Sequence, residues 1–213
     1  MVSCDSSHSL AKRRQVKDAP KFTLYVGPMW GSKTTRLLAD LERYKYQHKR
    51  IAAFKPMIDD RYGASEIVTH SGWKHPAMCV ADGSDLYGAL AAFDEVPHVI
   101  AVDEAFMIPG IADALIYLYR LGFSIAVSSL DMSATAKPFK EIEKMMPWAT
   151  RIDKCAAVCT TCGRDAYYTH KKTASEDEIE VGGSDLYEPR CAICHPLIMS
   201  QDVLVERIRE GGE

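Results

Sequence analysis

The sequence lacks a long apolar run, a strong net charge and an apolar signal segment at its start. No stretch approaches the roughly 18 consecutive apolar residues of a membrane-spanning helix, so we expect no membrane contact. The formal net charge of −3 gives no basis for bulk electrostatic binding to nucleic acid. Without a signal segment, the seven cysteines are expected to be reduced thiols, which predicts a cytoplasmic protein.

Internal repeats and long low-complexity tracts are also missing. Of the 213 residues, 47% are hydrophobic and 26% are charged, so the chain can bury a sizeable core. This length favours one core with a small appendage. Residues 1–20 combine serines with a basic cluster and show no apolar periodicity. We interpret them as a disordered arm; a targeting or nucleic-acid-binding arm is the alternative.

Strand and helix patterns alternate from residue 22 onward. Nearly continuous apolar runs predict buried strands, at 22–26, 51–55, 98–104 and 124–130. Helices are expected after them, at 33–48, 84–93, 110–121 and 138–146, and residues 56–76 are expected to be loop. Strands covered on both faces are typical of a mainly parallel sheet with flanking helices. The predicted fold class is therefore α/β, with a doubly wound sheet.

A phosphate-loop pattern follows the first predicted strand. Gly27, Lys33 and Thr34 match a loop whose backbone N–H groups hold phosphate, whose lysine reaches the terminal phosphates and whose hydroxyl binds Mg²⁺. Ser32 departs from the pattern, which has glycine directly before the lysine; here the glycine is Gly31. The alternative is an ordinary turn with a surface lysine.

Two acidic residues, Asp103 and Glu104, end a strongly apolar strand. The carboxyl ends of parallel strands line the ligand crevice, so these acids and the phosphate loop are expected to share one rim of the sheet. Asp103 suits Mg²⁺, and Glu104 suits proton removal from a hydroxyl nucleophile. A pair of solvated acids at a strand end is the alternative.

Two tight cysteine pairs, Cys159 with Cys162 and Cys191 with Cys194, stand near the end of the chain. Four thiolates from two such turns are typical of a structural Zn²⁺ site. Redox pairs or disulfides would need an oxidising compartment or a thioredoxin-like context. His195 follows the last cysteine and is an alternative ligand.

In their order along the chain, these motifs resemble those of the type II thymidine kinases, the cytosolic cellular and poxviral kind. The resemblance spans about 22–195 and includes further short motifs, at Asp59 to Tyr62, Leu130-Asp131, Lys137 to Phe139, Tyr168-Thr169 and Gly182 to Tyr187. It implies transfer of a phosphoryl group from ATP to the 5′-hydroxyl of thymidine or deoxyuridine. It also implies Mg²⁺, a structural Zn²⁺, a small-molecule nucleoside substrate and a homotetramer.

The resemblance also implies roles for individual residues. The catalytic residues would be Glu104 as general base, Lys33, and Arg61 as a cation oriented by Asp59. Contacts to ATP and Mg²⁺ would come from Gly27, Gly31, Ser32, Lys33, Thr34, Asp59 and Asp103. The nucleoside would be bound by Met29, Phe139, Thr169, Gly182, Gly183 and Tyr187, the last three in a lasso-like loop. We divide the chain into a disordered arm (1–20), a phosphate-loop domain (21–150), a zinc-binding lasso domain (151–196) and a tail (197–213).

Several residues depart from the family pattern. Besides Ser32, Ala105 and Phe106 follow Glu104 where glycine and glutamine are usual, and Ala134 stands where an aromatic residue is common. A smaller Ala134 side chain predicts tolerance of a larger 5-substituent on the base. The alternatives are an inactive nucleotide sensor, another phosphate-loop enzyme, and a zinc-ribbon binding module on a decayed kinase core. The acidic residues between the cysteine pairs speak against a nucleic-acid-binding ribbon; they include Glu176, Asp177, Glu178, Glu180 and Asp185.

Overall fold

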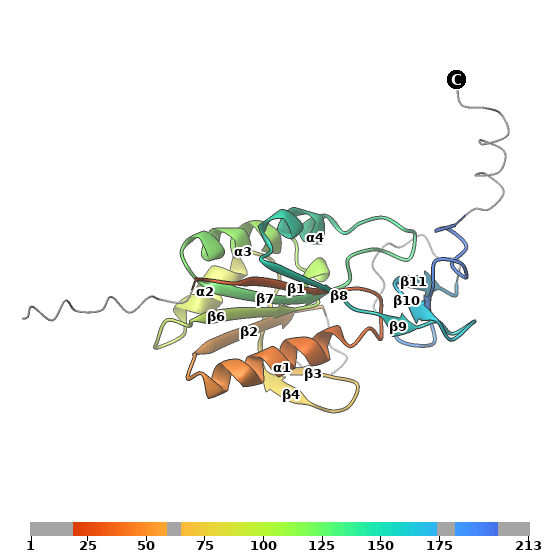
Figure 1. Ribbon diagram of the computed structural model, residues 1–213. Helices are drawn as coiled ribbons and strands as arrows, with labels where there is room; N and C mark the ends of the chain where they lie inside the picture. The colour runs from red at the N-terminus through yellow and green to blue at the C-terminus, as the bar shows by residue number, and fades with distance from the viewer. Residues whose placement is uncertain (1–18, 59–64, 174–181, 200–213) are drawn as a thin grey trace, which may run out of the picture.

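The computed structural model describes residues 19–58, 65–173 and 182–199. Its centre is a six-stranded sheet in the order β5-β2-β6-β7-β1-β8, in which every neighbouring pair is parallel (Figure 1). The strands are β1 (Phe22–Val26), β2 (Ile51–Pro56), β5 (Met78–Val80), β6 (Val99–Asp103), β7 (Ser124–Ser129) and β8 (Arg151–Lys154). The predicted parallel α/β sheet is therefore confirmed.

Helices cover both faces of this sheet. Figure 1 shows α1 on one face, with α3 and α4 on the opposite face. The helical segments are α1 (Lys33–Tyr46), α2 (Asp85–Ala91), α3 (Ile111–Arg120) and α4 (Lys140–Met145), with the short 3₁₀ turns η1 (Ala105–Met107) and η2 (Met146–Trp148). The four predicted helices are confirmed, each a few residues shorter than expected.

The alternation of side chains along the strands divides the core in two. Leu24 and Val26 of β1 pack in one cluster with Leu115 of α3, whereas Tyr25 packs in the other cluster with Leu38 of α1. Successive strand residues point to opposite faces, and here both faces are covered. This explains why the strands are apolar along their whole length.

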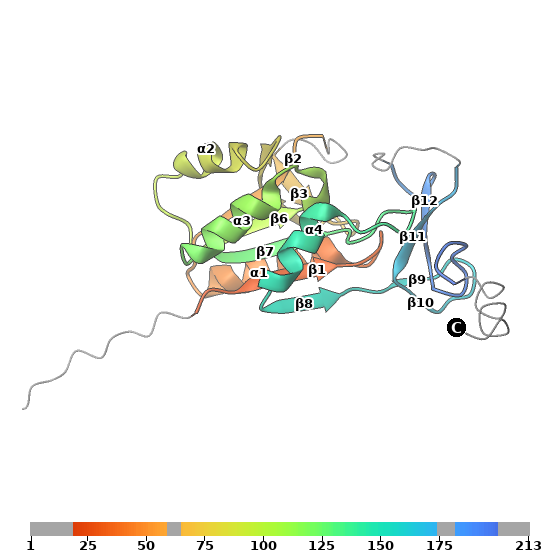
Figure 2. The same ribbon diagram turned by 90° about the horizontal axis from the view of Figure 1, so that it is seen from above.

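A small lobe follows β8. Two antiparallel hairpins build it, β9 (Ala157–Val158) with β10 (Asp165–Ala166) and β11 (Tyr168–Lys171) with β12 (Tyr187–Arg190). Figure 2 shows this lobe beyond one end of the central sheet. The domain boundary proposed between 150 and 151 lies just before β8, and β8 itself pairs with β1 in the sheet.

One prediction about the fold is wrong. Residues expected to be loop contain the antiparallel hairpin β3 (Glu66–Val68) and β4 (Lys74–Pro76). Strands of three residues are too short to leave a periodic pattern in the sequence. Within the described parts of the chain, no helix has the length and apolarity needed to cross a membrane.

We predict that Leu38→Ala lowers the free energy of unfolding by about 2–5 kcal/mol, because it removes buried methyl groups and leaves a cavity beneath α1. Leu38 is 1% exposed, and Tyr46 of the same helix is 79% exposed. Tyr46→Ala is therefore the matched control, with an expected change within about 0.5 kcal/mol. Urea unfolding measures both, and equal losses in the two variants would contradict this packing.

Candidate functional site

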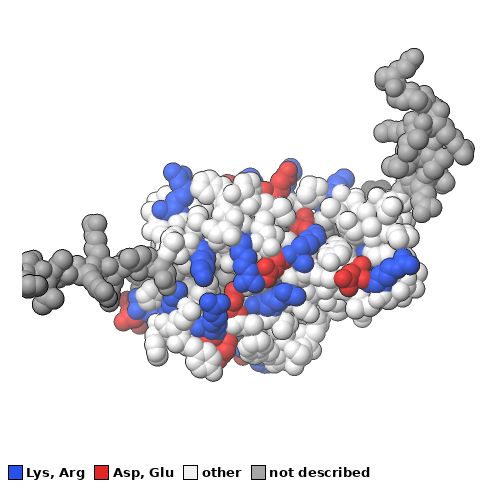
Figure 3. All heavy atoms as spheres, viewed as in Figure 1, with Lys and Arg blue, Asp and Glu red and all other residues white. Residues whose placement is uncertain are grey.

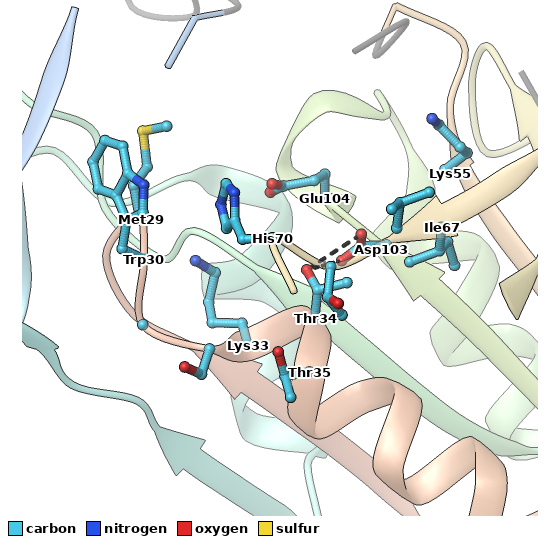
Figure 4. Close-up of a pocket in the computed structure, with 14 residues that line it drawn as sticks. Met29, Trp30, Lys33, Thr34, Thr35, Lys55, Ile67, His70, Asp103 and Glu104 are labelled. Carbon is cyan, nitrogen blue, oxygen red and sulfur yellow. Dashed lines mark hydrogen bonds between the residues drawn. The ribbon is translucent and has the colours of Figure 1, made fainter. Parts of the chain in front are cut away.

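A pocket lies at the carboxyl ends of β1, β2 and β6, where the phosphate loop meets the hairpin β3–β4 (Figure 4). This is the expected place for a ligand in a doubly wound sheet. The residues that line it are Met29, Trp30, Gly31, Ser32, Lys33, Thr34, Thr35, Lys55, Ile67, Val68, Thr69, His70, Asp103 and Glu104. The phosphate loop and the acidic strand end therefore share one rim, as predicted.

The loop between β1 and α1 has a strained backbone. Gly27 has φ +143°, and a Cβ atom there would lie 2.3 Å from the carbonyl oxygen of Cys155, so only glycine fits. Trp30 (φ 61°) and Ser32 (φ 58°) also lie in the left-handed region, whereas Gly31 does not. Each of these side chains costs about 1–2 kcal/mol of backbone strain. The position directly before Lys33 thus has a backbone that favours glycine, but it is occupied by Ser32.

The N-terminus of α1 is suited to an anion. Ser32 is its N-cap residue and makes no side-chain capping bond to any described residue. The first turn of the helix carries no acidic residue, so its free N–H groups and the helix dipole favour a phosphate group. Lys33 is buried beside them, and its Nζ donates a hydrogen bond of 2.7 Å to the carbonyl oxygen of Pro28. Burial lowers the pKa of Lys33, while Glu104 and Asp103 oppose this effect.

Asp103 faces the start of α1 across the pocket. Thr34 Oγ1 donates a hydrogen bond of 3.1 Å to Asp103 Oδ1, which also accepts one from Ser128. Burial, and then repulsion by Glu104, raises the pKa of Asp103 to about 7. The hydroxyl and carboxylate oxygens are ligands of the kind that Mg²⁺ prefers. The donor set therefore fits the Mg²⁺ site predicted from the sequence.

Glu104 follows β6 and turns into the same pocket. Its backbone is left-handed, with φ 49° and ψ 44°. Strained backbones of this kind cluster at functional sites, where the surrounding structure holds them. Figure 4 shows Lys33, His70 and Glu104 directed into one space, with Met29 and Trp30 at its side. A carboxylate is thereby placed opposite the N-terminal end of α1.

The residues assigned to the nucleoside lie in two places. The Met29 N–H donates a hydrogen bond of 3.1 Å to Thr169 Oγ1, so Thr169 lies beside Met29 of the pocket lining without itself lining the pocket described above. Phe139 is 7% exposed and packs against Phe106, with ring centroids 4.5 Å apart, in the core below α4. Phe139 is not among the residues that line the pocket described above.

The lasso-like loop is described only in part. The carbonyl oxygen of Gly183 accepts hydrogen bonds from the N–H groups of Leu186 (3.2 Å) and Tyr187 (3.0 Å), which forms a turn before β12. Gly182 precedes this turn, and Tyr187 is buried with Lys171 Nζ over its ring. Asp59 and Arg61, like residues 1–18 and 200–213, lie outside the described residues. Their predicted roles stay predictions.

The four paired cysteines converge in the small lobe. The Sγ atoms of Cys159, Cys162, Cys191 and Cys194 all lie within 4.8 Å of one another, and one pair is 3.6 Å apart. A tetrahedral Zn²⁺ with bonds of about 2.3 Å places its sulfurs about 3.8 Å apart. The cluster therefore fits the Zn²⁺ predicted from the sequence.

The protonation of these thiols also fits a cation. Burial raises the pKa of Cys159, but backbone N–H groups and Cys162 lower it to about 6. Hydrogen bonds with Cys162 and Cys191 raise the pKa of Cys194 to about 12. Thiols bind a metal in their deprotonated form, so a divalent cation at the centre of the four sulfurs would take the place of their protons. His195 lies outside the cluster, because its Nε2 donates to the Thr169 carbonyl oxygen (3.1 Å) and its Nδ1 accepts from the Leu197 N–H (3.2 Å).

Seven lining residues were not among our predicted site residues: Trp30, Thr35, Lys55, Ile67, Val68, Thr69 and His70. Lys55 is 3% exposed near the carboxyl end of β2. The rule that selected Asp103 would also have selected Lys55, since both follow buried apolar residues at the same edge of the sheet. Ile67 and His70 belong to the hairpin that was expected to be loop, and no pattern in the sequence marks them.

We predict that Asp103 makes the stability of the protein fall as pH rises. A carboxyl whose pKa is raised by folding contributes stability that is complete below about pH 4 and is lost as pH rises through about 7. Asp103→Asn removes this loss, so the variant should be more stable than the wild type at about pH 8 without nucleotide or divalent cations. Urea unfolding from pH 5 to pH 8 measures the effect, with exposed Asp94→Asn as the control. Parallel profiles for wild type and Asp103→Asn would contradict it.

Comparison with known proteins agrees with the geometry of the site. The family model for thymidine kinase matches residues 20–195, which include the phosphate loop, the acidic strand end and both cysteine pairs. A protein named thymidine kinase from Mesoplasma florum is 32% identical over 183 residues, covering 82% of this chain and 90% of that protein. The chain therefore belongs to the thymidine kinase family.

Proposed function

We propose that this protein transfers the γ-phosphoryl group of ATP to the 5′-hydroxyl of thymidine or of a related 5-substituted deoxyuridine. One observation carries the proposal beyond family membership. The uncapped end of α1, with Lys33 and Thr34, faces Asp103 and Glu104 across a single pocket. This arrangement supports a site that would combine phosphate binding, a Mg²⁺ position and a base.

The phosphate loop is the element that would bind ATP. Its left-handed residues Trp30 and Ser32 lead into the free N–H groups at the start of α1. Lys33 Nζ donates to a loop carbonyl oxygen and is placed to donate to phosphate oxygens instead. Thr34 Oγ1 and Asp103 would hold Mg²⁺, which when bound neutralises charge on the phosphates. Lys33 and the helix N-terminus then stabilise the charge that develops on the transferred group.

Glu104 is the residue that would accept the proton of the 5′-hydroxyl. Its left-handed backbone turns the carboxylate away from the Asp103 carboxylate and into the pocket. A base adjacent to a phosphate site contributes by raising the nucleophilicity of the hydroxyl as the bond to phosphorus forms. Arg61, oriented by Asp59, is proposed on the family resemblance alone as a further cation at the transferred group.

The nucleoside would bind between the phosphate loop and the small lobe. The hydrogen bond from Met29 to Thr169 supports this placement, because it joins two residues proposed to contact the base. Phe139 is proposed as a wall of the base pocket. Gly182, Gly183 and Tyr187 are proposed as the loop that closes over the nucleoside, largely through backbone groups.

The remaining proposals concern partners and metal. We propose one structural Zn²⁺ in the four-cysteine cluster, and a homotetramer and cytoplasmic location from the family resemblance alone. We propose no nucleic-acid partner. On the face seen in Figure 3, basic side chains alternate with acidic ones and form no field of one sign. Ser32 has a left-handed backbone, and Lys33 and Thr34 keep their hydrogen bonds to Pro28 and Asp103, which supports an intact phosphate loop.

We predict that Glu104→Gln lowers kcat/KM for thymidine by about 10²–10⁴-fold, because the amide keeps the shape of the side chain but cannot accept the proton. Affinity for ADP should stay within about twofold of the wild type, since the phosphate loop is unchanged. A phosphoryl-transfer assay and calorimetry measure the two quantities. Glu143→Gln, an exposed carboxylate on α4, is the matched control. Absence of transfer to any deoxynucleoside by a wild-type protein that binds ATP would favour the sensor interpretation.

We also predict that a 5-substituent larger than methyl is accepted at least as well as thymidine, because Ala134 stands where the family commonly has an aromatic residue. Ala134 is half-buried in the segment that Met132 and Pro138 close by a β-bridge. Ala134→Phe should therefore shift the ratio of kcat/KM values toward thymidine by about tenfold, equivalent to about 1.4 kcal/mol. Thr135→Phe, at the exposed neighbouring position, is the control. A wild-type enzyme with a higher kcat/KM for thymidine than for the 5-substituted substrates would exclude the idea.

A further inference from the structure

The hydrogen bonds within the phosphate loop are too few to hold its strained backbone in place. Trp30 and Ser32 are both left-handed non-glycine residues within a few positions of each other. Within the loop, Pro28 accepts one bond of 3.3 Å from the Gly31 N–H and one of 2.7 Å from Lys33 Nζ. Residues in such conformations persist only when their surroundings determine them. The neighbours of the loop must therefore be part of what keeps it in its binding shape.

The small lobe supplies the first of these neighbours. The half-buried ring of Trp30 packs against the buried cluster of that lobe, which comprises Ala157, Cys159, Ala166 and Cys191. Two members of this cluster are cysteines of the proposed Zn²⁺ site. Figure 4 shows the Trp30 ring at the side of the pocket, beside the ribbon of the C-terminal segment. The position of Trp30 therefore depends on the arrangement of the cysteines.

A chain of hydrogen bonds links the phosphate loop to a second neighbour, His195. The Met29 N–H donates to Thr169 Oγ1 (3.1 Å), and the Thr169 carbonyl oxygen accepts a bond from His195 Nε2 (3.1 Å). His195 is 1% exposed, and its own N–H donates to the carbonyl oxygen of Cys191 (3.0 Å). Through its backbone N–H and its imidazole, His195 thus connects the second cysteine turn to β11, whose Thr169 contacts Met29 of the phosphate loop.

Both routes include Cys191, and they end at the adjacent loop residues Trp30 and Met29. We propose that Trp30 and His195 are positioning residues, through which the four-cysteine lobe keeps the phosphate loop in the shape that binds nucleotide. Zn²⁺ in this lobe therefore raises the affinity for ATP, although the sulfurs do not line the phosphate pocket. The kinetic part of the inference rests on the proposed kinase function; the binding part does not.

The fluorescence of Trp30 gives a direct test. The chain has three tryptophans, so Trp73→Phe with Trp148→Phe leaves Trp30 as the only one. In this variant, removal of metal with a chelator should shift the Trp30 emission to longer wavelength and increase its quenching by acrylamide. Affinity for ADP, measured by calorimetry, should fall at least tenfold. Added Zn²⁺ should restore both signals. Unchanged emission and ADP affinity after metal removal would overturn the proposal, and so would a purified protein that binds no Zn²⁺.

Side-chain variants in the metal-loaded protein test the same contacts. Trp30→Ala should weaken ADP binding about tenfold and raise KM for ATP more than it lowers kcat, and Trp30→Phe should restore most of both. His195→Ala should act in the same direction, and His195→Gln, which retains a donor, should recover part of the loss. Trp148→Ala, a half-exposed position outside the lining of the pocket, is the control. If Trp30→Ala and His195→Ala bind ADP as the wild type does, the proposal fails.

The two proposals can fail separately. If ADP affinity and Trp30 emission follow the metal while no nucleoside is phosphorylated, the positioning role stands and the kinase proposal fails. If thymidine is phosphorylated while Trp30 emission and ADP affinity do not change on metal removal, only the positioning role fails.

Discussion

The contact between the phosphate loop and the chain that leaves β8 is the constraint on which the site depends. Gly27 lies so close to the Cys155 carbonyl oxygen that no side chain fits between them. The Cys155 N–H also donates a bond of 2.7 Å to the Val26 carbonyl oxygen, which fixes the end of β1. Because β1 cannot shift, the helix that follows begins at the rim of the sheet. The N–H groups of α1 that we propose to bind phosphate are placed by this contact rather than by the helix itself.

The charges at the rim are balanced by burial and by one another. Burial works against the charged forms of both Lys33 and Asp103, and each is supported by groups of opposite charge or by hydrogen bonds. Asp103 lies within reach of Thr34 and Ser128, so its oxygens have fixed positions. A site of this kind costs stability without a ligand and gains it when phosphate and a cation enter. The site is thus preorganised for charged ligands, at the expense of the free protein.

Much of this architecture was predictable, because its causes are local. Continuous apolar runs mark the strands, glycine and lysine mark the phosphate loop, and paired cysteines mark the four-cysteine lobe. Asp103 was placed correctly at the rim because the carboxyl ends of parallel strands meet there. Residues whose role depends on distant contacts were not predictable in this way. Ile67 reaches the pocket through a hairpin of three-residue strands, and Trp30 owes its position to cysteines more than 120 residues away in the sequence.

Ser32 shows why a departure from a family motif has to be judged by conformation. From the sequence alone, serine in place of glycine meant either local strain or a position that tolerates serine. The backbone of Ser32 is left-handed and leads directly into α1. The loop therefore keeps its shape, and Ser32 adopts a strained backbone conformation. Trp30 and Glu104, on the two sides of the pocket, also have left-handed backbones. Three left-handed side chains around one site are costly in the free protein, and folds retain such residues where the rigid surroundings hold them. The fixed conformations of Ser32 and Glu104 therefore support retained chemistry rather than a decayed site.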